Sequence, residues 1–165
     1  MKYSFFLILN VFLLWGCTNK YTVAEKNVED EVIENSNSIA FKLGKDFFIK
    51  KNVDVELLKK SYIVNQNHFQ SIFGFDHAKN SVMIPIDFNK EFVIPIILDM
   101  TNVASKIEVE DVQVLNNEIL IKYTVNQLYK LSYLIQPNEL IILEKNRIRD
   151  LSKMKLKFNR TTNIL

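Results

Sequence analysis

The side chains that could carry acid–base or metal chemistry in this chain are few and widely spaced. His68 and His77 are the only histidines, and they lack further ligands at a spacing typical of a zinc site. Asp87 and Glu91 could act as paired carboxylates, but a turn cap for Asp87 and an exposed strand end for Glu91 explain them without chemistry. No G-x-S-x-G motif and no glycine-rich phosphate loop occurs. We therefore expect no enzyme activity, no metal and no cofactor.

Cys17 is the one cysteine of the chain, and it follows an N-terminal apolar run. Lys2 supplies a short positive region, and Phe5 to Trp15 is too short an apolar run for a membrane-spanning helix. Leu14-Trp15-Gly16-Cys17 resembles a bacterial lipobox, with a branched residue at −3 and a small residue at −1, although Trp15 departs from the usual −2 residue. A lone cysteine is more often a buried hydrophobe or a free thiol. Its position here predicts lipidation of Cys17.

The sequence predicts a signal peptide at residues 1–16, a lipidated flexible tether at residues 17–38 and a folded β-rich α+β domain at residues 39–165. The tether is polar and carries an acidic cluster at Glu29, Asp30, Glu31 and Glu34, so it cannot bury enough apolar surface to offset its ordering entropy. Two or three acyl chains hold a protein firmly on a bilayer. Thr18 is not the aspartate often linked to inner-membrane retention, which favours the outer membrane.

The charge of the chain argues against nucleic-acid binding. Loss of the signal peptide removes Lys2 and lowers the formal charge from +2 to +1, which is too small for a basic nucleic-acid interface. The basic residues from Lys153 to Arg160 alternate with Met154, Leu156 and Phe158. This pattern is typical of the solvated face of an edge strand, and contact with phospholipid head groups is the alternative.

The composition favours a β-rich fold, because Ile, Val, Phe and Tyr are abundant and there are only three glycines and three prolines. We expect an α+β class: one domain with a mostly antiparallel β-sheet and one or two short helices. The predicted strands cover residues 38–43, 46–50, 62–64, 91–98, 106–115, 119–125, 131–135, 139–144 and 153–158. A turn at Gly44-Lys45 would join the first two strands into a hairpin. Short helices are predicted at residues 52–58 and 67–73, the second ending at Gly74.

Two strands around Asn116-Asn117 form the clearest predicted hairpin, since asparagine tolerates the positive φ of a two-residue turn. The alternation of apolar residues changes phase at Glu110-Asp111, which predicts a β-bulge. The apolar run at 92–98 predicts a strand buried on both faces, where Pro95 requires a bulge or an unpaired edge. Five residues should be buried together: Ile94, Ile96, Ile121, Tyr123 and Ile141.

Three consecutive segments carry a resemblance to a known family. They are Tyr62-Ile63-Val64, then Asn67 to Gly74, then Ile86 to Ile94 with the pattern I-D-F-x-K-x-x-V. In this order they resemble the C-terminal domain of PrcB-like protease-complex subunits and their lipoprotein relatives, over about residues 46–145. The glycine-rich turn that many members place after the central strand is replaced here by residues 101–105. The resemblance implies an α+β domain that associates with, stabilises or inhibits an exported protease.

These observations give a primary hypothesis and two alternatives. The primary hypothesis is a non-enzymatic lipoprotein, lipid-anchored through Cys17 in the cell envelope, at the outer membrane, whose domain binds another envelope protein such as an exported protease. The first alternative is a lipid-anchored carrier or sensor of a small apolar ligand, with a pocket lined by Phe69, Phe73, Phe88 and Phe92, although core packing also explains these residues. A hydrolase, the second alternative, would require the two histidines to lie together.

Overall fold

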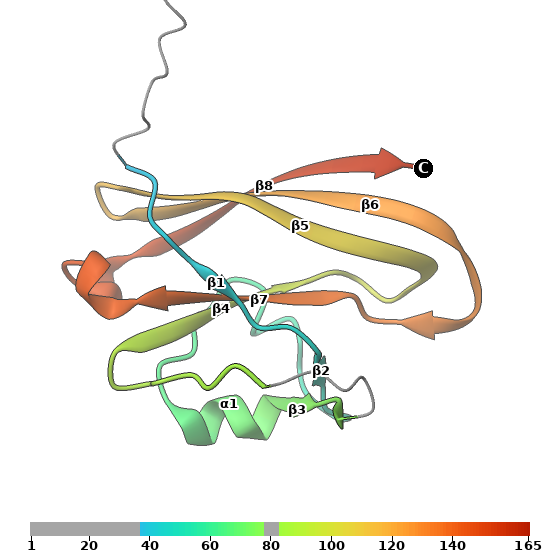
Figure 1. Ribbon diagram of the computed structural model, residues 1–165, viewed down its shortest axis with the longest axis horizontal. Coiled ribbons are helices and arrows are strands. Elements are labelled where there is room, and N and C mark those ends of the chain that lie inside the picture. The colour runs from blue at the N-terminus through green and yellow to red at the C-terminus, as the bar shows by residue number, and fades with distance from the viewer. Residues whose placement is uncertain (1–36, 78–82) are drawn as a thin grey trace, which may run out of the picture. The chain divides into compact units, whose positions relative to one another are not determined.

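The computed structural model describes residues 37–77 and 83–165, so the predicted signal peptide, Cys17 and the predicted tether up to residue 36 lie outside the described residues. The described chain is mostly β-strand with one short α-helix, as predicted (Figure 1). Its elements are β1 (Lys42–Leu43), β2 (Phe47–Ile49), α1 (Gln66–Ile72), β3 (Phe73–Phe75), β4 (Glu91–Ile97), β5 (Thr101–Leu115), β6 (Glu118–Ile135), β7 (Asn138–Glu144), the 3-10 turns η2 (Lys145–Arg147) and η3 (Leu151–Lys153), and β8 (Lys155–Ile164).

The strands form layers around a central sheet. Strands β1, β7 and β4 make this central sheet, and β5, β6 and β8 make a second three-stranded sheet, here called the outer sheet. Figure 1 shows the outer sheet on one side of the central sheet, with α1 and the β2–β3 pair on the other side. The β6–β8 pair is parallel and every other strand pair in these sheets is antiparallel. The expected mostly antiparallel architecture is therefore confirmed.

Strand β4 divides its side chains between two cores, because successive side chains of a strand point to opposite faces. Phe92, Ile94 and Ile96 enter the core between the two sheets, whereas Val93 and Ile97 enter the core between the central sheet and α1. All seven residues of β4 are buried, as predicted for this apolar run. The sheet–sheet core also holds the other members of the predicted buried set, Ile121, Tyr123 and Ile141, so that prediction is confirmed.

Pro95 sits in β4 without disturbing its pairing to β7, where the register runs unbroken from Glu91↔Glu144 to Ile97↔Asn138. The N–H and C=O of Val93 bond to Ile63, on the side away from β7. Because backbone groups two residues apart point the same way, the nitrogen of Pro95 also faces away from β7. Of the two options predicted for Pro95, the unpaired edge is therefore correct and the bulge is not.

The β5–β6 hairpin is confirmed but is longer than predicted. Asn116 has φ 55° at its turn, and a register shift between Val109 and Asp111 places the predicted bulge at Glu110. Residues 101–105, which stand where the resembling family places a glycine-rich turn, belong to β5, and the separate strand predicted at 131–135 is the end of β6. The predicted edge strand at 153–158 is also confirmed, as β8, which runs on to Ile164.

The predicted first hairpin does not form, because β1 pairs with β7 and β2 pairs with β3. The chain changes layers between β1 and β2, at Gly44 and at Asp46, whose φ is 62°. A β-carbon on Gly44 would lie 2.9 Å from the β-carbon of Leu140, so glycine permits close approach to β7. A turn is present at Lys45 and Asp46, but it carries the chain from one sheet to another and does not close the predicted hairpin.

One of the two predicted helices is present. Helix α1 begins after Asn65, whose Oδ1 accepts the His68 N–H at 2.8 Å. Residues 52–58 form turns instead, because Asn52 has φ 66° and Asp54 Oδ1 accepts the Glu56 N–H at 3.1 Å, a local bond that competes with a helix. Gly74 is not a helix cap but a residue of β3, where a β-carbon would overlap the ring of Phe48.

Candidate functional site

The predicted chemical residues do not assemble into a metal or nucleophile site. His68 is exposed on α1, and His77 is exposed after β3 with its ring 5.0 Å from that of Phe75. Within residues 37–77 and 83–165, no group of three or more His, Cys, Asp or Glu side chains is placed to hold a metal ion. Cys17 lies outside the described residues, so its lipidation stays a prediction.

Asp87 and Glu91 form a turn that leads into β4. Asp87 Oδ1 accepts the Asn89 N–H at 3.1 Å, and the Asp87 carbonyl accepts the Glu91 N–H at 2.7 Å, which confirms the turn cap. Glu91 is only 6% exposed, so the expected exposed strand end is wrong. Its Oε2 accepts the Asp87 N–H at 2.9 Å and its Oε1 pairs with Lys42. Both carboxylate oxygens have partners, which indicates that Glu91 closes the turn onto β1.

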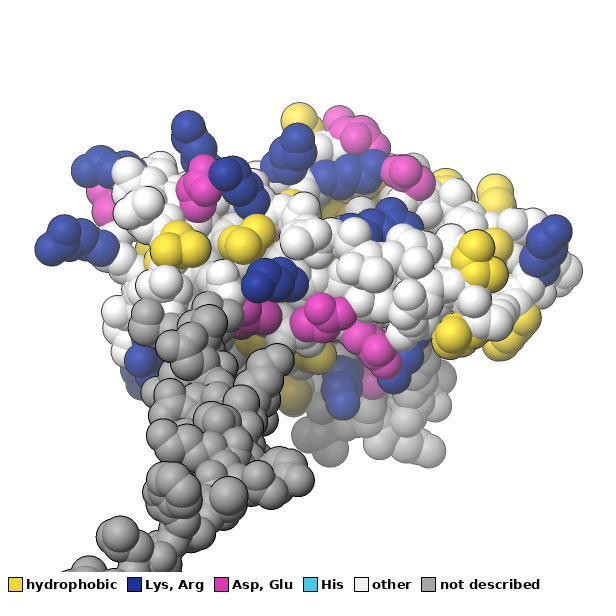
Figure 2. All heavy atoms as spheres, turned by 90° about the horizontal axis from the view of Figure 1, so that it is seen from above, with side chains coloured by type: hydrophobic (Ala, Val, Ile, Leu, Met, Phe, Trp, Pro, Cys, Tyr) yellow, Lys and Arg dark blue, Asp and Glu magenta, His cyan; other side chains and the backbone are white. Residues whose placement is uncertain are grey.

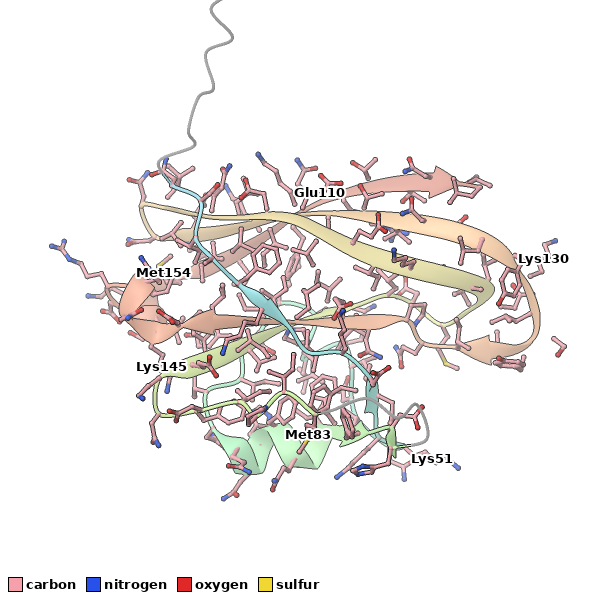
Figure 3. The ribbon with its side chains drawn as sticks, viewed as in Figure 1. Lys51, Met83, Glu110, Lys130, Lys145 and Met154 are labelled. Carbon is pink, nitrogen blue, oxygen red and sulfur yellow. The ribbon has the colours of Figure 1, made fainter. Side chains whose placement is uncertain are left out.

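A polar pocket of about 550 Å³ opens over this turn, at the end of the central sheet that holds Lys145 in Figure 3. Lys145 Nζ donates to the Phe88 carbonyl at 2.5 Å and so fixes the far side of the turn. The pocket lining is Lys42, Pro85, Asp87, Asn89, Lys90, Glu91, Glu144, Lys145 and Asn146. Among the described residues, the lining includes no serine, threonine, cysteine or histidine. It offers ammonium, carboxylate and amide groups to a ligand.

An apolar groove of about 430 Å³ runs along α1, near Met83 in Figure 3. Phe69, Phe73 and Phe88 line it as predicted, together with Phe47 and Phe75. The Phe69 ring lies 5.2 Å from that of Phe73 and 5.6 Å from that of Phe88. Phe92 does not join them, because it points to the other face of β4, where its ring lies 6.1 Å from that of Tyr62. The predicted pocket lining is therefore correct for Phe69, Phe73 and Phe88 and wrong for Phe92.

The most unusual surface of the described chain lies on the last part of β6. Leu128, Tyr129, Tyr133 and Leu134 are each between 42% and 65% exposed, and we call these four residues the apolar end. Among the described residues Lys130, which lies between them in sequence, has no carboxylate partner. Figure 2 shows several hydrophobic side chains at this end of the domain, whereas most of the Lys, Arg, Asp and Glu side chains of the visible face lie elsewhere on it.

The apolar end arises because the ladder between β5 and β6 becomes irregular there. Ser105 pairs with Gln127, Val103 with Lys130 and Thr101 with Ile135, so β6 carries extra residues opposite a short part of β5. Extra residues break the period-two alternation that directs apolar side chains into a core. The sequence does not predict this surface, because the pattern of Leu131 to Ile135 indicates a separate strand and not the end of β6. The missing alternation from Gln127 to Leu134 was the available signal.

Three ionisable groups near the apolar end have shifted pKa values: Lys59, Asp99 and Glu139. Lys59 Nζ donates to Asp99 Oδ1 and to Glu56 Oε1, both at 2.6 Å. The hydrogen bond to Asp99 and then that to Glu56 raise the pKa of Lys59, and the bond from Lys59 lowers the pKa of Asp99. Burial raises the pKa of Glu139, which follows the corner between β6 and β7. None of these three groups bonds to a side chain of the apolar end.

Comparison of the chain with protein-family profiles, curated proteins and solved structures found no match. The described part of the chain also contains no helix with the length and hydropathy of a membrane span.

Proposed function

We propose that this chain is a non-enzymatic lipoprotein of the cell envelope whose domain binds another envelope protein through the apolar end. The observation that carries the proposal is the exposure of Leu128, Tyr129, Tyr133 and Leu134 on one short segment. Soluble domains bury most such side chains, and clustered exposed ones mark interaction surfaces. Tyrosine is enriched at protein interfaces, because its ring is apolar and its hydroxyl keeps a hydrogen-bond partner.

The anchor in this proposal is an acyl-modified Cys17, inferred from the lipobox-like Leu14-Trp15-Gly16-Cys17. An anchored domain meets its partner at the membrane surface, where a tether raises the effective concentration. The test is metabolic labelling with a fatty-acid analogue in cells that carry wild type or Cys17→Ser. We expect label on wild type alone, and equal labelling of both proteins would remove the anchor from the proposal.

The resemblance to PrcB-like subunits supports an exported protease as the partner class. Gentle crosslinking of the full chain in membranes, followed by purification, should recover one specific partner from wild type. The double variant Tyr133→Ser with Leu134→Ser should lose it. Leu115→Ser is the matched control, since Leu115 is an exposed leucine at the opposite end of β5. Recovery that is equal in the double variant and wild type would contradict binding through the apolar end.

A carrier of a small apolar ligand is the second candidate, and the groove along α1 supports it. The groove has a volume of about 430 Å³ and a largely aromatic lining, which are properties of ligand sites. Ile84 lines it and is 38% exposed, so Ile84→Asp would place a charge in the groove with little effect on the cores. Saturable binding of a fluorescent fatty acid that Ile84→Asp abolishes would support this candidate. Absence of binding to wild type would contradict it.

A further inference from the structure

Strand β8 forms one edge of the outer sheet over its whole length. It pairs with β6 from Glu118↔Lys155 to Gln127↔Ile164 without a register shift. No other described strand pairs with it, since the order of the outer sheet is β5-β6-β8. Natural sheets usually protect a long edge strand with a bulge, a proline or a covering segment. The described β8 has none of these, although its charged side chains are all basic, which also discourages edge pairing, and its last six residues are all exposed.

The backbone bonds show which residues of β8 face the free edge. Lys155 N–H donates to Asn117 O, and Leu165 N–H donates to Gln127 O, both at 2.9 Å. In a parallel ladder, alternate residues direct both backbone groups to the same neighbour. The odd-numbered residues therefore bond to β6. The backbone groups of the even-numbered residues face away from the sheet, and these residues are Leu156, Phe158, Arg160, Thr162 and Ile164.

The side chains of β8 specify what could pair there. The strand carries Lys155, Lys157 and Arg160 and has no acidic residue. Leu156 and Phe158 pack against the sheet–sheet core, so Lys155 and Lys157 point to the opposite, outer face. Lys157 already pairs with Glu118 at 2.7 Å, whereas Lys155 has no carboxylate partner among the described residues. A strand added beside β8 would place alternate residues next to these lysines and the others next to the two apolar side chains. Carboxylates suit the first set of positions and aliphatic side chains suit the second.

We propose that β8 binds an extended segment of a partner protein, in which acidic and aliphatic residues alternate, as a fourth strand of the outer sheet. Binding by strand addition obtains its affinity from main-chain hydrogen bonds and its selectivity from alternate side chains. This inference rests on the proposed protein-binding function. It gives that function a specific mode, because the C-terminal end of β8 pairs with Gln127, directly before the apolar end.

The test uses the full chain in detergent micelles and a synthetic probe, acetyl-Thr-Glu-Val-Glu-Val-Glu-Val-Thr-amide with a fluorescent label. We expect saturable binding in which the amide hydrogens of Phe158, Arg160 and Thr162 exchange more slowly by NMR. A control peptide with lysine in place of each glutamate should not bind. Thr162→Pro removes one outward N–H, so the affinity should fall about tenfold. Thr162→Val keeps that N–H and should bind as wild type does.

Four results would overturn the proposal: no binding of the probe, equal binding of the lysine peptide, unchanged affinity in Thr162→Pro, or outward amides already protected in the free protein. The last result would mean that a second copy or another segment of this chain occupies the edge. The Tyr133→Ser and Leu134→Ser variant separates the two proposals. This variant should still bind the probe, and loss of probe binding would be a fifth result against strand addition. Unchanged recovery of the partner by this variant would instead refute the role of the apolar end.

Discussion

The two halves of the β5–β6 hairpin share a pair of strands but differ in how they treat apolar side chains. Near the turn, Ile119, Ile121, Tyr123 and Val125 occupy every second position and are buried in the sheet–sheet core. Toward the corner with β7, the strand gains extra residues and exposes the apolar end. Both halves are rich in apolar residues, so composition does not separate them. The regularity of the ladder decides which apolar residues stabilise the fold and which remain available to a partner.

On the outward face of the regular half, polar and charged side chains contact one another. Asn126 Nδ2 donates to Glu108 Oε2 at 2.9 Å, and Lys157 Nζ lies 2.7 Å from Glu118 Oε2. Thr124 donates to Glu110 across the same two strands. These polar side chains satisfy one another across the sheet. The irregular half has no such network among the described residues, which fits a surface that is left for an external partner.

The largest expected contrast comes from truncating one side chain in each half. Ile121→Ala removes fully buried atoms from the sheet–sheet core and should cost about 2–5 kcal/mol of unfolding free energy. Leu134→Ala, at a side chain that is 62% exposed, should change it by less than about 0.5 kcal/mol. Urea unfolding of the two variants measures the contrast. A loss under about 0.5 kcal/mol in Ile121→Ala would show that the regular half is not the core.

A smaller loss of unfolding free energy is expected for substitutions at Glu91, where β4 begins. Glu91→Ala leaves the Asp87 N–H and the ammonium of Lys42 without their partner, and it should cost about 1–3 kcal/mol. Glu91→Gln keeps an oxygen for the Asp87 N–H and should cost less. Thermal unfolding of both variants tests this order. Equal losses would mean that the charge of Glu91, and not the turn hydrogen bond, holds the turn closed.

Much of the fold was predictable from the sequence, because local signals and burial agreed there. Asn116-Asn117, the phase change at Glu110-Asp111 and the apolar run of β4 each depend on neighbours along the chain. The failures came from long-range pairing. Nothing near Gly44 indicates that β1 pairs with β7, and nothing near Glu91 indicates that Lys42 covers it. The apolar end was also hidden, since exposure depends on a ladder irregularity between distant strands.

The smallest expected effect is a pH-dependent change in unfolding free energy at Glu139, which lies at the end of the central sheet opposite Glu91. Burial raises the pKa of Glu139 above its ordinary value of 4.5, so the folded state holds this proton more tightly than the unfolded state does. Stability from this group is present at low pH and is lost as the pH rises through that raised pKa. Glu139→Gln should therefore shift the gap in unfolding free energy between pH 4 and pH 7 in favour of pH 7, relative to wild type. An unchanged gap would show that burial at this corner does not bias the proton.

The most direct test of the account is site-specific photocrosslinking of the full-length protein in living cells. A benzophenone amino acid replaces Tyr133 in the apolar end or, as the matched position, Lys145 beside the polar pocket at the other end of the central sheet. If a partner binds through the apolar end, we expect a discrete adduct with one envelope protein from position 133 and none from position 145. The same adduct from both positions, or none from position 133, would contradict partner binding through the apolar end.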